Sequence, residues 1–299
     1  MRADPNYISN LTASLDQSSS AADALTTELS SGLRVASLQD DPVAAAQSSL
    51  MGSAIATDDT FVQTASSEAS TMQVADSTLG EVVTQLTSAL ALAVQGNDGS
   101  LNASNTGTIA QQLSSIRDQV LSLANSSYLG TSLFGGSQGS VKPFELDTST
   151  TPATVNYVGD TNLQYVQTPA GQKIQVNLPG SSVFGTTASG VFGALNQLID
   201  DFSSGVSSAT ITADTSTLTS SLGQVSQQRS ILDSSLSTLQ STSTYVQTDV
   251  SQLKAQQSTL VGADTATVAS QLSSQETQYQ ALLNVMSALQ KTDLFDYLN

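Results

Sequence analysis

The sequence contains no cysteine, no histidine and no tryptophan. Without Cys or His, the chain cannot carry the usual nucleophile–base pairs of hydrolytic enzymes, nor a zinc site built from those ligands. Aromatic residues make up only 5% of the chain, and charged residues only 11%. Because few large side chains are available to fill a thick core, the composition favours thin, elongated helical packing.

Basic residues are scarce as well. Eight Lys and Arg stand against 25 Asp and Glu, which gives a formal net charge of −17. The bases are scattered and form no patch, so the sequence predicts neither nucleic acid nor a membrane surface as a partner. No stretch approaches the roughly 18 apolar residues that a membrane span requires, and no secretory signal peptide is recognisable. We therefore expect a cytosolic protein, or one that is exported without a cleaved signal.

Both ends of the chain carry apolar residues in alternating steps of three and four. This spacing places the side chains along one face of a helix, here called a seam, which must be buried against another helix. If the two terminal seams paired only with each other, much apolar surface would stay exposed. We therefore expect an assembly surface that orders against neighbouring subunits. The predicted surface consists of Ile8, Leu11, Leu15, Leu25, Leu272, Tyr279, Leu282, Met286, Leu289, Leu294, Phe295 and Leu298.

Glycine, proline and aspartate mark the ends of the predicted helices. Gly32 follows the first helix in the position where a left-handed cap is common. Pro42 suits the first turn of a second helix, and Asp41 before it is suited to cap that helix. A long C-terminal seam over 218–260 is broken at 261–264 and restarts out of register, which sets the last helix apart from the long one.

The middle of the chain has a different character. Glycine and asparagine over 96–107 predict a loop between the second helix and a third. Residues 128–190 hold nine of the 19 glycines and four of the six prolines. Short alternating runs lie at 155–157, 163–165 and 174–178, separated by turn residues at 159–160 and 169–171. These signals predict a small β-rich insert with strands and turns. Helical spacing resumes at Val191.

The expected fold class is therefore mainly α. The N- and C-terminal segments form an elongated helical bundle or coiled coil, with the small β-rich insert in the middle of the chain. The inner coiled coil is assigned to 1–41 and 262–299, a helical rod to 42–130 and 191–261, and an outer insert to 131–190.

No catalytic or metal site is predicted. Asp40 and Asp41 could suggest a metal site, but the helix start explains Asp41 better. Ser251 and Lys254 have the SxxK spacing, but the companion motifs of Ser-Lys enzymes are absent and the pair lies deep in the long seam helix. Asp200 and Asp201 are expected to be solvated helix residues. We expect no enzyme activity, no cofactor and no metal.

The loop after the first helix carries the most specific motif of the chain. The pattern LSSGxRxxxxxDDP is matched by Leu29, Ser30, Ser31, Gly32, Arg34, Asp40, Asp41 and Pro42. It resembles the N-terminal motif of the bacterial flagellin family, and segments 263–269 and 278–282 resemble that family's C-terminal helix. Pro42 after two aspartates, with the ending at 294–298, is more similar to members that join hook to filament than to flagellin itself. The resemblance covers nearly the whole chain and departs only at the first few residues.

This resemblance implies a structural role without catalysis. A homo-oligomeric ring of about eleven subunits would join the hook, through the first hook-associated protein, to the flagellin filament. It also implies an extracellular location in the flagellum, type III export as an unfolded chain, and an export chaperone on the C-terminal helix. One alternative is flagellin, the bulk filament subunit. The other is a rod-borne surface- or carbohydrate-binding adhesin, in which Tyr157, Tyr165 and Phe184 could supply stacking faces, although such aromatics are more often core residues.

Overall fold

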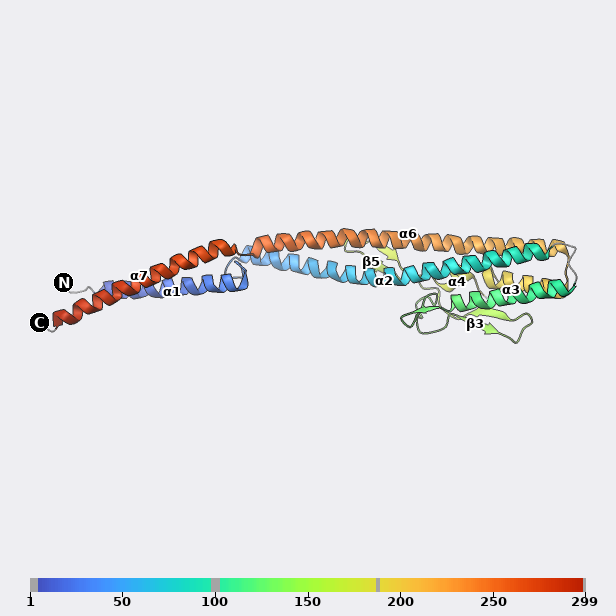
Figure 1. Ribbon diagram of the computed structural model, residues 1–299, viewed down its shortest axis with the longest axis horizontal. Coiled ribbons are helices and arrows are strands. Elements are labelled where there is room, and N and C mark those ends of the chain that lie inside the picture. Colours follow the sequence, from blue (N-terminus) through green and yellow to red (C-terminus); the bar gives the residue numbers. More distant parts are fainter. Residues whose placement is uncertain (1–4, 98–102, 187–188, 298–299) are drawn as a thin grey trace. The chain divides into compact units, whose positions relative to one another are not determined.

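Helices account for most of the chain in the computed structural model (Figure 1). The structure describes residues 5–97, 103–186 and 189–297, and the side chains of 7–97, 104–186 and 189–288. The helices are α1 (Pro5–Ser31), α2 (Pro42–Gly96), α3 (Ala103–Ala124), α4 (Gly180–Phe184), α5 (Gly190–Ser204), α6 (Ser208–Val261) and α7 (Thr265–Tyr297). The strands are β1 (Ser127–Tyr128), β2 (Thr131–Ser132), β3 (Phe144–Asp147), β4 (Thr154–Tyr157), β5 (Tyr165–Gln167) and β6 (Lys173–Gln175). The mainly helical fold class with small β hairpins, as predicted from the sequence, is confirmed.

The chain divides into two compact units. Unit 1 combines the residues up to Thr57 with those from Thr248 onward, and unit 2 is Asp58–Gln247. Both boundaries fall inside long helices, α2 and α6. The five-segment division expected from the sequence stays a prediction.

In unit 1, the helix ends lie where the sequence places them. Gly32 follows α1 with φ 69°, the left-handed conformation expected of a helix cap. Its amide donates to the carbonyl of Glu28 at 2.9 Å. Because α2 begins at Pro42 and α7 begins at Thr265, the predicted second helix start and the predicted break at 261–264 are both confirmed.

In unit 2, the apolar seams of α2 and α6 are buried, as their spacing predicts. Leu79, Val82 and Leu86 of α2 are 0% exposed, and so are Leu218 and Leu239 of α6. Full burial of one such side chain contributes about 1.5–3 kcal/mol to stability. The two helices run alongside each other here (Figure 1).

Arg229 is a polar member of the α6 seam, and it pairs with α2. Its Nε and Nη2 donate to the two carboxylate oxygens of Asp76 at 2.5 and 3.1 Å. The hydrogen bond from Arg229 lowers the pKa of Asp76. The guanidinium packs beside Gly80, 3.6 Å from the position a Cβ would take there, which is an ordinary van der Waals distance. This two-pronged pair specifies the register of α6 against α2.

An aromatic cluster forms the core of the β-rich insert. The ring centroid of Phe144 lies 5.3 Å from those of Phe184 and Phe192 and 5.0 Å from that of Tyr157. Phe184 is 0% exposed, and the hydroxyl of half-buried Tyr157 donates to the carbonyl of Asp160 at 2.6 Å. Phe184 therefore cannot serve as the stacking face that an adhesin would need.

The hairpins follow local turn chemistry, although the sequence does not predict all of them. β1 and β2 are joined by Leu129 and Gly130, whose φ values of 51° and 82° give the positive pair that a type I′ turn requires. Gly171, with φ 87°, lies in the predicted turn between β5 and β6. β4 lies on a predicted alternating run, whereas its antiparallel partner β3 is not predicted, although Phe144 and Leu146 alternate with two acids there.

Two local expectations are wrong. α3 begins at Ala103, inside the predicted loop, and it accommodates Gly107 in its first turns. Asp201 in α5 is 2% exposed rather than solvated, because it lies on the face of α5 that also carries the buried Leu198 and Phe202.

α2 is long and apolar enough, by length and composition alone, to cross a membrane, and it is the one such helix in the described ranges. The support for a membrane span is weak, because a buried core helix passes the same test. The packing of the α2 seam accounts for its apolar residues.

Candidate assembly interface

The terminal helices α1 and α7 pack along each other in unit 1 (Figure 1). Their seams meet as the spacing predicts, and Ser18 and Val268 are 6% and 4% exposed. Most other seam side chains are only half-buried, because each helix is covered from one side by a single neighbour. The half-buried seam residues are Leu11, Leu15, Ala22, Leu25, Leu272, Gln275, Tyr279, Leu282 and Met286.

Larger apolar side chains on the same two helices remain exposed. Tyr7 is 51% and Ile8 40% exposed near the start of α1, and Leu29 is 37% exposed at its end. On α7, Leu283 and Val285 are 39% and 43% exposed. Apolar side chains exposed on both helices of the pair suit a surface that associates with another protein. Four residues predicted for this surface have side chains outside the described residues: Leu289, Leu294, Phe295 and Leu298.

A polar contact interrupts the apolar seam between the two helices. The amide Nε2 of Gln275 donates to Oγ of Ser18 at 3.1 Å. A single polar layer in a coiled coil favours one register and one orientation, because any shift leaves a buried polar group unpaired. The sequence indicates this layer only as two polar residues at seam positions, and their pairing is visible only in the fold.

The motif after α1 forms the joint that connects α1 and α2 to the break between α6 and α7. The amide of Arg34 donates to the carbonyl of Val261 at 2.8 Å, and the amide of Ala263 donates to the carbonyl of Gly32 at 2.9 Å. These bonds flank a short antiparallel bridge between two segments more than 200 residues apart in the sequence, Leu33 and Gly262 being its paired residues.

The side chain of Arg34 reinforces this joint. Its Nη2 donates to the carbonyl of Leu260 at 3.0 Å and lies 3.7 Å from Oδ2 of Asp41. A cation at the C-terminal end of α6 also interacts favourably with the helix dipole. Both charged side chains are partly exposed, so the ion pair itself contributes little, and the carbonyl bond is the structural element.

The two adjacent acids of the motif both accept hydrogen bonds from backbone amides, Asp41 at the start of α2 and Asp40 within the preceding loop. Oδ1 of Asp41 accepts from the amides of Val43 and Ala44 at 3.2 and 3.0 Å, which confirms the predicted helix cap. The carboxylate of Asp40 accepts from the amides of Ser37 and Ala36, and these bonds lower the pKa of Asp40. In the described residues, no three His, Cys, Asp or Glu side chains gather where they could hold a metal ion.

The start of α7 carries a cap that sequence reasoning missed. Asp264 accepts from Oγ1 of Thr267 at 2.8 Å and from the amide of Ala266 at 3.1 Å, and the bond from Thr267 lowers the pKa of Asp264. The sequence does contain the usual signal for such a cap, because an aspartate stands directly before the restarted seam. Leu29 and Ser30 of the motif lie on the exposed end of α1, and Ser31 bonds only locally.

Two family models match the parts of the chain that hold these helices. The model of the bacterial flagellin N-terminal helical region matches residues 6–139, and that of the bacterial flagellin C-terminal helical region matches 215–298. The chain belongs to the bacterial flagellin family. The joint and nearly all of α1 and α7 lie within the matched regions. This is a family of structural proteins of the flagellum and not of enzymes, in agreement with the sequence-based expectation.

Several relatives of this family member are hook-associated proteins. Flagellar hook-associated protein 3 of Salmonella typhimurium is 26% identical over 163 residues, which are 54% of this chain and 50% of the relative. The chain thus spans about half the length of the curated relatives it matches.

Solved structures share the fold at lower identity. The flagellar junction protein FlgL of Legionella pneumophila has a TM-score of 0.58 at 15% identity, over 72% of this chain and 99% of that one. FlgL of Bacillus cereus has a TM-score of 0.58 at 19% identity, over 70% and 99%.

Proposed function

We propose that this chain forms the junction ring of the bacterial flagellum, between the hook, through the first hook-associated protein, and the flagellin filament. The observation that carries the proposal is the α1–α7 pair, whose seams stay half-buried when only these two helices meet. The curated relatives named hook-associated protein 3 favour the junction role over that of a bulk filament subunit.

In this role the terminal helices are the assembly surface. Copies of the chain associate as a closed ring of about eleven, in which neighbouring helix pairs cover each other's exposed apolar residues. The contact between Ser18 and Gln275 restricts how α1 and α7 align, so each copy presents the same surface. The capped joint around Gly32 holds the two helices together where they meet the rest of unit 1.

The same features suit export to the outside of the cell. The chain passes through the type III apparatus unfolded, and a chaperone covers α7 until export. A helical fold with no disulfide bonds can unfold and refold without redox chemistry. The expected location is the extracellular flagellum.

The first experiment tests the terminal helix. In a strain lacking this chain, we expect hooks without filaments and flagellin released to the medium, as seen by electron microscopy and immunoblotting. Full-length protein should restore motility, and a version without 266–299 should not, while the helices of unit 2 remain folded by circular dichroism. Filament growth with the truncated protein would refute the assembly role of α7.

Point variants make the same test with smaller changes. Leu15→Asn and Leu272→Asn each place an amide in the half-buried seam and are expected to prevent incorporation, whereas Ser273→Asn on the exposed face of α7 should not. Immunogold labelling separates the junction role from that of flagellin. Label confined to the hook–filament boundary is expected, and label along the whole filament would contradict the junction role.

A further inference from the structure

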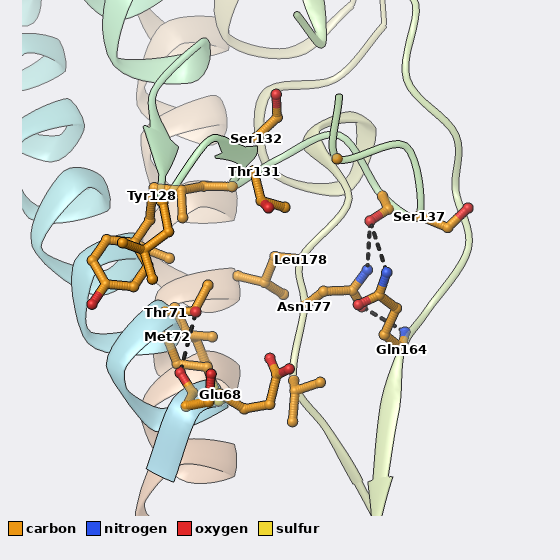
Figure 2. Close-up of a pocket in the computed structure, with 18 residues that line it drawn as sticks. Glu68, Thr71, Met72, Tyr128, Thr131, Ser132, Ser137, Gln164, Asn177 and Leu178 are labelled. Atoms are coloured by element: carbon orange, nitrogen blue, oxygen red, sulfur yellow. Dashed lines mark hydrogen bonds between the residues drawn. The ribbon is translucent and has the colours of Figure 1, made fainter. Parts of the chain in front are cut away.

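A cavity of about 360 Å³ lies in unit 2 between α2 and the β-rich insert (Figure 2). One side is formed by α2 with Glu68, Thr71 and Met72, and the opposite side by Gln164 and Asn177 of the insert. A cavity of this size falls within the range of small-molecule sites. It lies outside unit 1, which carries the proposed assembly surface.

The insert side of the cavity is held in place by its own hydrogen bonds. Nδ2 of Asn177 donates to the carbonyls of Asn162 and Gly136 at 2.9 and 3.3 Å. Oδ1 of Asn177 accepts from the amide of Gln164 at 2.7 Å, and Nε2 of Gln164 donates to the carbonyl of Gly136 at 3.4 Å. The side-chain amide of Asn177 and Nε2 of Gln164 are therefore paired within the insert, which holds this wall in place.

The α2 side presents one unpaired charge. Glu68 occupies a seam position between Ala65 and Met72, which are both 1% exposed, and its carboxylate points into the cavity (Figure 2). Glu68 makes no hydrogen bond or ion pair with the described residues, and its burial raises the pKa of its carboxyl group. A half-buried carboxylate without a partner destabilises the fold. Glu81, by contrast, lies on the exposed face of the same helix, where water solvates its carboxylate.

The chemistry of the lining selects the kind of cation. Glu68 is the one acid among the residues that line the cavity, so a divalent metal would find a single charged ligand there. An ammonium group needs one carboxylate and a few neutral oxygen acceptors, because it has one positive charge and three donors. Hydroxyl oxygens of Ser67 and Thr131 in the lining can supply such acceptors.

We propose that this cavity binds a primary ammonium group, carried by a lysine side chain or by a free alkyl amine, through an ion pair with Glu68. The aliphatic part of the ligand lies against Met72 and Leu178, which line the same cavity. The proposal does not depend on the junction role.

The test is a methyl NMR titration of the full-length chain. Met72 is one of four methionines in the sequence and lines the cavity, whereas Met51 lies in unit 1 and serves as an internal reference. With ¹³C-methyl methionine, N-acetyl-lysine methylamide and putrescine are added separately at neutral pH. We expect a saturable shift of the Met72 methyl signal with both probes and none at Met51. The tighter of the two probes identifies the source as a protein side chain or a free amine.

Matched variants separate binding at Glu68 from effects of overall charge and of altered folding. Glu68→Gln keeps the shape and should weaken binding at least about ten-fold, as expected for the loss of a charge-assisted hydrogen bond. Glu81→Gln removes the same charge from the exposed face and should leave binding unchanged. Glu68→Met restores an apolar seam and should stay folded without binding.

Three results would overturn the proposal. The first is the absence of any saturable shift at Met72, and the second is undiminished binding by Glu68→Gln. The third is an equal response to N-acetyl-norleucine methylamide, which has the length of lysine without its ammonium group.

Discussion

Burial raises the pKa of Asp201 well above its ordinary value, which allows a quantitative test. The residue is 2% exposed, and its Oδ2 has no hydrogen-bond partner in the described residues. Its Oδ1 accepts from Nε2 of Gln197 at 3.3 Å. Burial, with a further contribution from the neighbouring carboxyl groups of Asp214 and Asp200, raises the pKa of Asp201 from 3.8 to about 6. At neutral pH the folded chain therefore holds a buried carboxylate that its surroundings disfavour.

The sign of the effect follows from proton linkage. The folded state binds the proton of Asp201 more tightly than the unfolded state does, so the stabilisation is complete below about pH 4 and is lost as the pH rises through about 6. A difference of about two pKa units corresponds to about 3 kcal/mol near neutral pH. We expect Asp201→Asn, which cannot ionise, to stabilise unit 2 by about 1–3 kcal/mol at neutral pH and to have little effect near pH 4.

The assay is urea unfolding of both proteins across this pH range, followed by circular dichroism. Hydrogen exchange of the α5 amides locates the change in unit 2. Asp200→Asn is the matched control, because it removes the same charge one residue away on the exposed face of α5. It should give only a small part of the stabilisation, since Asp200 makes the smallest contribution to the raised pKa of Asp201. A stability difference for Asp201→Asn that is the same at low and neutral pH, or that Asp200→Asn reproduces, would refute this reasoning.

Two further substitutions test the backbone geometry. A Cβ at Gly262 would lie 2.3 Å from the carbonyl oxygen of Ser258, so Gly262→Ala should destabilise the joint by about 1–3 kcal/mol and speed proteolysis near the start of α7. Gly223→Ala, where nothing lies within 4 Å, should instead stabilise α6, and equal effects of both changes would contradict the steric argument. Leu129→Asn should raise the free energy of unfolding by about 0.5–1 kcal/mol, because Leu129 has φ 51° and asparagine tolerates this conformation better. Leu163→Asn, another exposed leucine in the insert, is the control and should give no such gain.

Much of the helical framework is readable from the sequence, because its signals are local. The φ of 69° at Gly32 and the cap formed by Asp41 depend on residues within a few positions of each other. The three-four spacing of the seams likewise needs only the geometry of one helix. For these reasons the end of α1, the end of α6 and the start of α7 follow closely from the pattern, whereas α6 begins at Ser208, ten residues before the predicted seam.

The candidate interface is only partly readable in the same way. The sequence places Arg34 and the break at 261–264 in two distant motifs, but it does not reveal that they bond to each other. It also places Ser18 and Gln275 at seam positions without pairing them.

The sequence by itself determined the long helices, most of their ends and the spacing of their apolar faces, since each depends on neighbours along the chain. The tertiary structure alone decided which charges are buried. Asp200 and Asp201 are identical neighbours in the sequence, yet only the second is enclosed, and Glu68 stands in a seam like its apolar neighbours yet points into a cavity. The physical reason is that burial depends on what lies opposite a side chain, and in this protein those opposing residues come from distant segments of the chain.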